Sequence, residues 1–156
     1  MRKAKRSPAG EALTGLVLEL FRVNNRMLAD GDRLVAGLGL TSSRWQVLGT
    51  IVAAGRPQQV AWLARDMGVT RQNVLRIVND LASDGFVSLE SNPHHRRASL
   101  VVLTGKGQQA FEAAMNLQTP WVNGLADGMK VADIRTTHEV LARLRHKLEG
   151  RGDAAD

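Results

Sequence analysis

The chain has 156 residues, 44% of them hydrophobic, and carries a formal net charge of +6 without a single cysteine. A chain of this size forms one ordinary domain, or one domain with helical appendages, and its apolar share argues against wholesale disorder. The absence of cysteine excludes disulfides, thiolate zinc sites and cysteine nucleophiles, while the basic balance favours a polyanionic partner.

The first ten residues are basic and contain a helix breaker. Arg2, Lys3, Lys5 and Arg6 precede Pro8. Residues 1–10 are therefore expected to form a flexible arm, either a solvated tail or a segment that contacts a nucleic-acid backbone. No apolar stretch follows the start as in a secretory signal, and none approaches the roughly 20 residues of a membrane span, so we expect a cytoplasmic protein.

A long amphipathic helix is predicted from Glu11 to about Gly37. Its apolar residues recur at helical spacing: Leu13, Leu16, Val17, Leu20, Val23 and Met27. Thr41 or Ser42 can cap a second helix, whose apolar residues continue to Ala54 before Gly55 stops it.

Two short helices joined by a glycine turn are predicted next. The first spans Val60–Met67 and ends at Gly68, where the turn requires backbone angles that cost other residues energy. Val69 is expected to pack into the core beside the turn. Thr70 caps the second helix, which runs to about Asp84 and has an apolar face at positions i, i+3, i+4 and i+7: Val74, Ile77, Val78 and Leu81.

The periodicity then changes to that of strands. Residues 86–90 and 98–103 are short, partly β-branched runs that flank a polar segment at 91–97, which predicts a β-hairpin with a basic tip.

Two further helices complete the chain. Thr104 caps the first of them, which Pro120 is expected to interrupt. The last is predicted from Val131 to Leu148, with the residues from Gly150 onward frayed.

The order helix, helix, glycine turn, helix, hairpin is typical of a winged helix-turn-helix. An ordinary three-helix core has the same pattern, so the residues on the exposed face must distinguish a DNA-binding motif from such a core. On the helix that Thr70 caps, this face holds Arg71, Gln72, Asn73, Leu75, Arg76 and Asn79. Arginine can bind guanine bidentately and Asn or Gln can bind adenine, while the amides of a helix N-terminus favour phosphate. The acids Asp80 and Asp84 lie toward the far end. This face therefore predicts recognition of duplex DNA.

The hairpin tip supports the same interpretation. Arg96 and Arg97 follow Pro93 on a predicted exposed turn. A guanidinium on such a wing can enter a narrow minor groove, where the negative potential is strongest.

The segment from Val60 to Val87 resembles the central motif of the MarR-type transcriptional regulators. The residues Leu103-Thr104-Gly105-Lys106-Gly107 match that family's junction between wing and helix, and the resemblance covers nearly the whole chain. It implies a mainly α fold with a small β-hairpin wing and a homodimer that straddles a pseudo-palindromic operator, with half-sites about 10 bp apart.

The resemblance also implies a domain organisation. The winged helix-turn-helix lobe covers residues 41–104. Dimerisation helices flank it at 11–40 and 105–150, and a frayed tail follows at 151–156. The apolar stripes of the outer helices agree, because one small lobe could not bury them.

Two positions depart from the family pattern. The family's wing usually reads Asp-x-Arg, with the acid bracing the arginine, whereas this chain has His95 in the acid's place. His95 could hydrogen-bond to the backbone or add positive charge when protonated. Leu75 stands where the family often has a small polar residue; it either touches a thymine methyl or is a tolerated apolar surface residue.

Family members often bind small aromatic or anionic molecules between the dimerisation helices and the lobe. The candidates here are Met27, Arg44, Trp45 and Leu48, although Trp45 and Leu48 are equally explained as ordinary core residues.

Other chemistry is not expected. His94 and His95 are adjacent and point apart, so they make a poor metal pair, and Gly105-Lys106-Gly107 lacks the spacing of a phosphate loop. No nucleophile has a suitable base beside it in the sequence. We therefore expect no metal, no cofactor and no enzymatic activity.

The sequence thus predicts a DNA-binding transcriptional regulator, with repressor the favoured polarity and release by a small effector. The alternatives are an architectural protein that binds DNA without sequence preference and a winged module that binds only protein.

Overall fold

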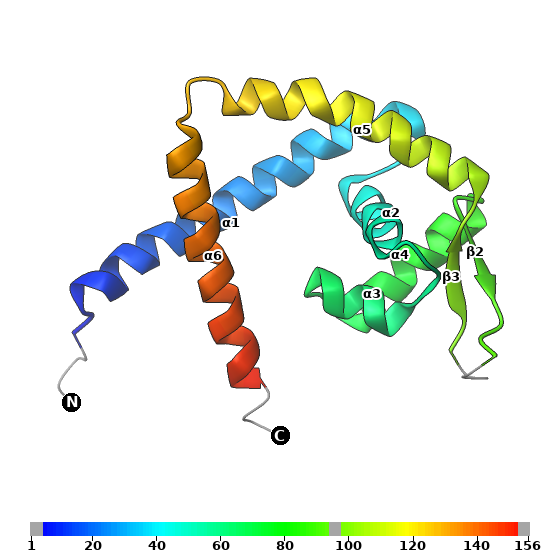
Figure 1. Cartoon of the computed structure of the whole chain (residues 1–156), viewed down its shortest axis with the longest axis horizontal. Coiled ribbons are helices and arrows are strands. Elements are labelled where there is room, and N and C mark those ends of the chain that lie inside the picture. Colours follow the sequence, from blue (N-terminus) through cyan, green and yellow to red (C-terminus); the bar gives the residue numbers. More distant parts are fainter. Residues whose placement is uncertain (1–4, 94–97, 153–156) are drawn as a thin grey trace. The chain divides into compact units, whose positions relative to one another are not determined.

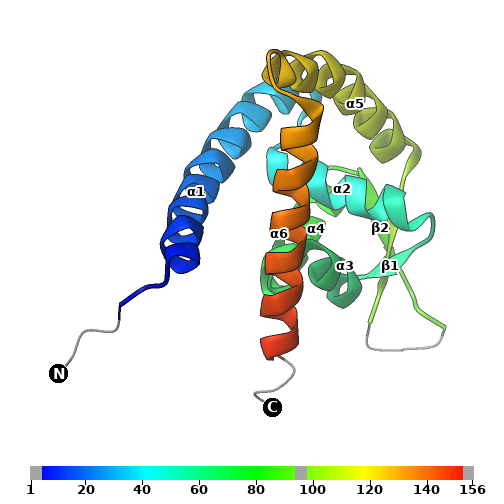
Figure 2. The ribbon, with the colours of Figure 1, turned by 60° about the vertical axis from the view of Figure 1, so that its left-hand side comes forward.

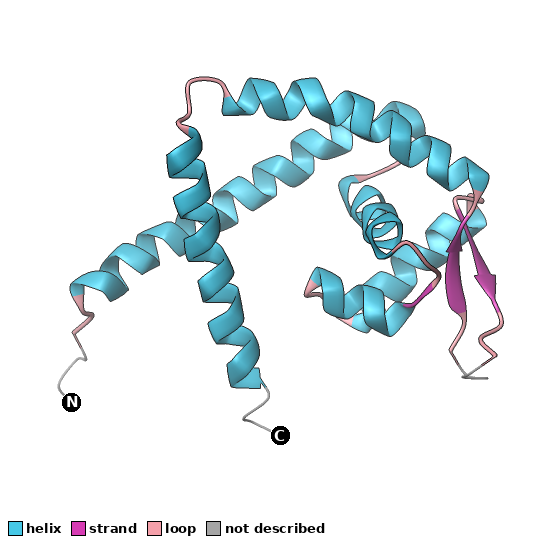
Figure 3. Cartoon of the chain, in the orientation of Figure 1, coloured by secondary structure: helices cyan, strands magenta, loops and turns pink. Residues whose placement is uncertain are grey.

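The computed structural model describes residues 5–93 and 98–152, with the side chains of residues 151 and 152 left undescribed. The chain divides into two compact units, residues 1–118 and residues 119–156. Most of the described residues are helical, and the first unit also contains a small antiparallel sheet (Figures 1 and 3). The predicted fold class, mainly α with a β-hairpin wing, is confirmed.

Helix α1 spans Pro8–Val35 and begins earlier than predicted. Ser7 caps it, since the Ser7 Oγ accepts a hydrogen bond from the Gly10 N–H at 3.0 Å. Pro8 starts the helix rather than breaking it, because a first-turn residue needs no N–H donor. The expectation that the whole of residues 1–10 is a flexible arm is therefore wrong from Pro8 onward. A short 3₁₀ helix, η1 (Ala36–Leu38), follows.

Helix α2 (Ser42–Ala54) has the predicted boundaries. Thr41 is the N-cap and Gly55 ends the helix in the left-handed conformation. Two hydrogen bonds join its start to α1: the Ser42 N–H donates to Asp32 Oδ1 at 2.6 Å, and the Ser42 Oγ donates to the carbonyl of Leu28 at 2.7 Å.

The helix-turn-helix consists of α3 (Val60–Met67) and α4 (Arg71–Ser83). Gly68 lies between them at a φ of 66°, a conformation that favours glycine, as predicted. The Thr70 Oγ1 caps α4 by accepting from the Asn73 N–H at 3.3 Å.

The sheet has one strand more than predicted. Strands β2 (Val87–Glu90) and β3 (Leu100–Leu103) form the hairpin, and β1 (Gln58–Gln59) pairs with the other side of β3. Gln58 lies opposite Val101, so the base of the wing is joined to the residues just before α3. Figure 2 shows this sheet beside α2.

The core of the first unit lies among α2, α3, α4 and the sheet. Its fully buried side chains include Leu48, Leu63, Leu81, Val47, Val74, Val78 and Val101. The predicted apolar face of α4 is confirmed, because all four of its residues are buried. The expectation for Val69 is wrong: its side chain is half-exposed, since the left-handed turn at Gly68 directs the chain outward.

Two predicted helix boundaries near the C-terminus are also wrong. Helix α5 spans Gly105–Ala126 and continues through Pro120. Proline removes one backbone hydrogen bond there, but Pro120 is exposed, so water can satisfy the freed carbonyl. Helix α6 runs from Val131 to Gly152, past the predicted end at Leu148, and Arg145 pairs with Glu149 at 3.1 Å near its end. No helix in the described ranges is long and apolar enough to cross a membrane.

Candidate nucleic-acid interface

The predicted reading residues lie on the exposed side of α4. Arg71, Gln72, Asn73 and Arg76 are all exposed, while the opposite face of the same helix is buried in the core. The first turn of α4 contains no acidic residue. The amide end of the helix therefore presents donors and positive charge to solvent, a combination that suits phosphates and base edges.

Arg76 is held along the helix by two neighbours. Its Nη2 donates to Asn73 Oδ1 at 3.3 Å, and its Nη1 lies 4.0 Å from Asp80 Oδ2. Asp80 thus lies near a predicted reading residue, although the sequence suggested only that it lies toward the far end. Both contacts are exposed and weak, so they orient the guanidinium without preventing it from binding another acceptor.

Leu75 lies on the same exposed face of α4. Its side chain is 43% exposed and packs into no part of the core. This placement agrees with both interpretations of Leu75, a contact to a thymine methyl or a tolerated apolar surface residue.

The wing residues His95, Arg96 and Arg97 lie outside the described residues. The strands that carry them are described: β2 and β3 pair from Val87 opposite Leu103 to Glu90 opposite Leu100. The hairpin therefore leaves the same lobe that carries α4.

Two cations gather at the C-terminal end of α4. Arg44 Nη1 donates to Asp84 Oδ2 at 2.7 Å and to the carbonyl of Gly39 at 3.2 Å. Lys106 Nζ donates to the carbonyl of Asp84 at 2.6 Å and lies 4.6 Å from the centre of the Phe86 ring. Positive charge at a helix C-terminus is favourable, so these contacts connect α4 to α2 and α5.

The four candidate effector residues differ in exposure. Leu48 is fully buried in the core, and Trp45 packs against that core. Arg44 is engaged with Asp84, and Met27 is half-exposed on α1. For Leu48 the structure supports the interpretation as ordinary core.

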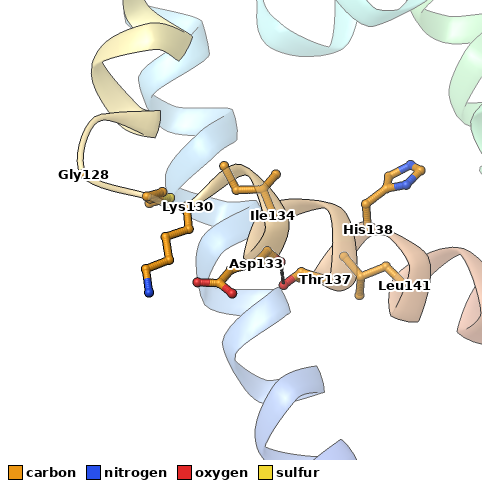
Figure 4. Close-up of a pocket in the computed structure, with 8 residues that line it drawn as sticks. Gly128, Lys130, Asp133, Ile134, Thr137, His138 and Leu141 are labelled. Carbon is orange, nitrogen blue, oxygen red and sulfur yellow. Dashed lines mark hydrogen bonds between the residues drawn. The ribbon is translucent and has the colours of Figure 1, made fainter.

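The second unit contains a shallow apolar hollow at the start of α6. It has a volume of about 570 Å³ and is lined by residues 128–130 and by one face of α6, including Ile134, His138 and Leu141 (Figure 4). The Thr137 Oγ1 donates to the carbonyl of Asp133 at 2.9 Å, so its hydroxyl donor is used within the helix. The exposed surface of the hollow is mainly apolar, although Lys130, Asp133 and His138 also line it.

Exposed apolar side chains also occur along the outer helices. On α1 they are Leu13, Leu18, Leu20, Phe21, Val23 and Met27; on α5 they are Met115, Leu117, Val122 and Leu125; on α6 they are Val131, Ile134 and Leu148. Scattered apolar residues on a surface are ordinary, but stripes of this kind mark an interaction surface.

Sequence reasoning missed one exposed aromatic residue. Trp62 of α3 is 45% exposed, and the guanidinium carbons of Arg56 and Arg65 lie 6.0 and 5.6 Å from the centre of its ring. The signal was present, because Trp62 falls outside the apolar stripe of α3. Among the described residues no cluster of three His, Asp or Glu side chains could hold a metal ion.

Comparison with known proteins agrees with this geometry. A model of the MarR family matches residues 38–98. The chain is 34% identical over 134 residues to the uncharacterized protein Rv2011c of Mycobacterium tuberculosis, covering 86% of this chain and 92% of that protein. It is 28% identical over 151 residues to the transcriptional activatory protein BadR of Rhodopseudomonas palustris, covering 93% and 85%.

Two solved structures have the same fold. A mutant of MarR from E. coli, complexed with operator DNA, matches with a TM-score of 0.70 at 23% identity, covering 85% of this chain and 97% of that one. The organohalide-sensing regulator RdhR-CbdbA1625, bound to 2,4-dichlorophenol, matches with a TM-score of 0.80 at 16% identity, covering 94% and 88%. With its motif, its helical order and its wing all in place, the chain belongs to the MarR family of transcriptional regulators.

Proposed function

We propose that this protein is a sequence-specific repressor that binds a pseudo-palindromic operator as a homodimer and is released by a small effector. Members of the MarR family are DNA-binding regulators rather than enzymes. The observation that carries the proposal is the acid-free first turn of α4, with Arg71, Gln72, Asn73 and Arg76 exposed beside it. The protein acts in the cytoplasm, where its DNA target lies.

The homodimer is supported by the exposed apolar side chains of the outer helices. A second copy would bury the stripes on α1, α5 and α6, together with the hollow beside Ile134. A two-fold dimer places two copies of α4 about 34–36 Å apart, one turn of DNA. The two-fold symmetry requires an operator with inverted half-sites.

Sequence-specific DNA binding can be tested by selecting bound duplexes from a random pool and then measuring the affinity of the selected duplex by fluorescence anisotropy. We expect one inverted repeat to emerge and to bind at least 1,000-fold tighter than random competitor, roughly the lower limit of specific recognition. Equal affinity for both would contradict the proposal and favour an architectural role. Thr70, Arg71, Gln72, Asn73, Leu75 and Arg76, with His95, Arg96 and Arg97 of the wing, are the proposed contacts.

A matched pair of variants locates the reading surface. Arg76 and Arg145 both sit on exposed helix faces and both face an acid four residues later, Asp80 and Glu149. Arg76→Ala should weaken operator binding by about 5- to 150-fold for each half-site, the loss of one bidentate base contact per copy of α4. Arg145→Ala removes the same charge and should leave binding nearly unchanged.

The effector is proposed to be a small aromatic or anionic molecule that binds near Met27, Arg44 and Trp45. Support comes from Arg44, whose guanidinium touches the end of α4 through Asp84. An anion that competes with Asp84 for Arg44 would loosen α4 and so weaken DNA binding. Addition of 2,4-dichlorophenol or benzoate to the DNA complex tests this class of molecule, with release read as a fall in anisotropy. Unchanged anisotropy at saturating concentrations of both would contradict an effector of this class.

The polarity of regulation is a separate question with its own test. BadR, a relative of similar length, is named an activatory protein. A reporter gene behind the selected operator should show lower expression when this protein is present, and higher expression would contradict the repressor assignment.

A further inference from the structure

Trp62 and two arginines form a cationic surface that is separate from the reading face of α4. Trp62 is the third residue of α3, Arg65 lies one turn later on the same helix, and Arg56 precedes β1. Both guanidinium groups lie close to the Trp62 ring. The three side chains are exposed, and we call them the Trp62 cluster.

Neither guanidinium of the Trp62 cluster is neutralised within the described part of the chain. Arg44, Arg76 and Arg145 each face a carboxylate, whereas Arg56 and Arg65 are in no ion pair with a described residue. The aromatic ring therefore takes the place of an acid as the partner of both arginines. Such contacts are favourable at exposed sites and leave the N–H donors at the edge of each guanidinium available.

The cluster borders a groove at the foot of the wing. The groove has a volume of about 420 Å³ and is lined by residues 56–59, Trp62, Asn92, Pro93 and Leu100. No acidic side chain is among its lining residues. The groove thus lies between α3 and the wing hairpin, on the lobe that carries α4.

We infer that the Trp62 cluster binds the phosphodiester backbone of the DNA that α4 reads, with Arg56 and Arg65 as the phosphate-binding residues and Trp62 as their positioning residue. The inference rests on the proposed function. In a helix-turn-helix the first helix crosses the DNA backbone while the second enters the groove, and here α3 is that first helix. Guanidinium groups match phosphate oxygens in geometry and charge.

Because its donors suit phosphates, the Trp62 cluster should contribute to DNA affinity and not to sequence preference. Contacts to phosphates fix the register of a protein on the duplex and carry no base information. The Trp62 cluster should therefore strengthen binding to every duplex by a similar factor. The alternative is that the cluster binds an acidic protein segment. In that case, altering the cluster should leave DNA binding unchanged.

The test compares an Arg56→Ala, Arg65→Ala double variant with an Arg135→Ala, Arg145→Ala double variant, which removes the same charge from α6. Binding is measured by anisotropy at several salt concentrations, on the selected operator and on a mixed-sequence duplex. Loss of one or two phosphate contacts per lobe should lower the slope of log K against log salt by about 0.9 for each contact. Affinity should fall by a similar factor on both duplexes, roughly 10-fold or more.

Two further variants separate charge from geometry. Arg56→Lys with Arg65→Lys keeps the charge and should keep most of the salt slope. Trp62→Leu removes the aromatic partner and should weaken binding on both duplexes without lowering the slope as far as the double alanine variant does. Circular dichroism melting of each variant verifies the fold.

The outcomes distinguish this inference from the proposed function. If Arg76→Ala weakens operator binding while the double alanine variant matches its α6 control in affinity and slope, the inference is overturned and the proposed function stands. If the wild-type protein binds no duplex, both fail. A loss confined to the operator, with mixed-sequence binding unchanged, would also overturn the inference, because it would indicate base reading.

Discussion

Arg44 of α2 and Asp84 at the end of α4 form an ion pair of 2.7 Å that spans 40 positions of the chain. The Arg44 side chain is 21% exposed and that of Asp84 is 48% exposed. The same Arg44 nitrogen also donates to the carbonyl of Gly39, which follows η1. One guanidinium thus connects the C-terminal end of the proposed reading helix to the segment that links α1 and α2.

A double-mutant cycle with Arg44→Ala and Asp84→Ala should reveal this connection. We expect a coupling free energy of about 0.5–1 kcal/mol in urea unfolding, the upper part of the range for exposed pairs, because Arg44 is largely covered. Arg22→Ala with Glu19→Ala, a more exposed pair on one helix, is the matched control and should couple by about 0.5 kcal/mol or less. Strict additivity for Arg44 and Asp84 would show that the pair contributes nothing.

Gly107→Ala should destabilise the junction between wing and α5. An added Cβ would collide with the carbonyl oxygen of Phe86 and would lie 2.8 Å from Leu103 Cδ1. Alanine normally stabilises a helix relative to glycine, but the collision is with backbone and should dominate, with a net loss of about 1–3 kcal/mol in unfolding free energy. Gly105→Ala is the control, since nothing lies within 4 Å of its added Cβ. Equal stability of the two variants would contradict the packing described here.

Leu75 lies on the exposed face of α4 and Leu81 on its buried face, so truncation of the two should change stability by very different amounts. Leu81→Ala should cost about 2–5 kcal/mol of stability because Leu81 is fully buried, whereas Leu75→Ala should change stability by about 0.5 kcal/mol or less. Denaturant unfolding measures both.

A thymine-to-uracil scan of the selected operator then tests the contact of Leu75. If Leu75 touches a thymine methyl, one substituted position will weaken wild-type binding and leave Leu75→Ala binding unaffected. The absence of any such position would make Leu75 a tolerated apolar surface residue.

Ile134→Glu should disrupt the proposed homodimer. Ile134 lines the hollow at the start of α6 and is 43% exposed in the single chain. Removing a charged side chain from water is costly, so the variant should shift sedimentation from dimer toward monomer and weaken operator binding. Leu89→Glu places the same charge on an exposed leucine of the wing and should leave the dimer intact. A monomeric wild-type protein would contradict the homodimer itself.

The elements of the lobe could be predicted because local signals agree with one another. Thr70, Gly55 and Gly68 mark helix ends and occupy the predicted caps, and Thr41 is the N-cap of the two candidates that the sequence offers for α2. The buried stripe of α4 follows directly from its spacing. Where such signals coincide, the boundaries are confirmed.

The incorrect predictions share one physical origin, because each depends on where a residue lies in the fold. Proline usually breaks a helix, yet Pro8 occupies the first turn of α1 and Pro120 an exposed position within α5. Strand β1 has only two polar residues and is defined by its partner β3, so no pattern along the chain could reveal it. The Trp62 cluster likewise depends on residues that the fold brings together, although the position of Trp62 outside the apolar stripe was visible.

The pairing of β1 with β3 has a consequence for how this protein can change over evolutionary time. Gln58 and Gln59 hold the foot of the wing through main-chain bonds, which require no particular side chains. Among the described residues, the pairs between β2 and β3 extend from Val87 and Leu103 to Glu90 and Leu100. The exposed positions that adjoin these pairs, Ser91 and Ser99, can therefore accept substitutions with little loss of fold. The surface at these positions can change while the paired strands beside them stay the same.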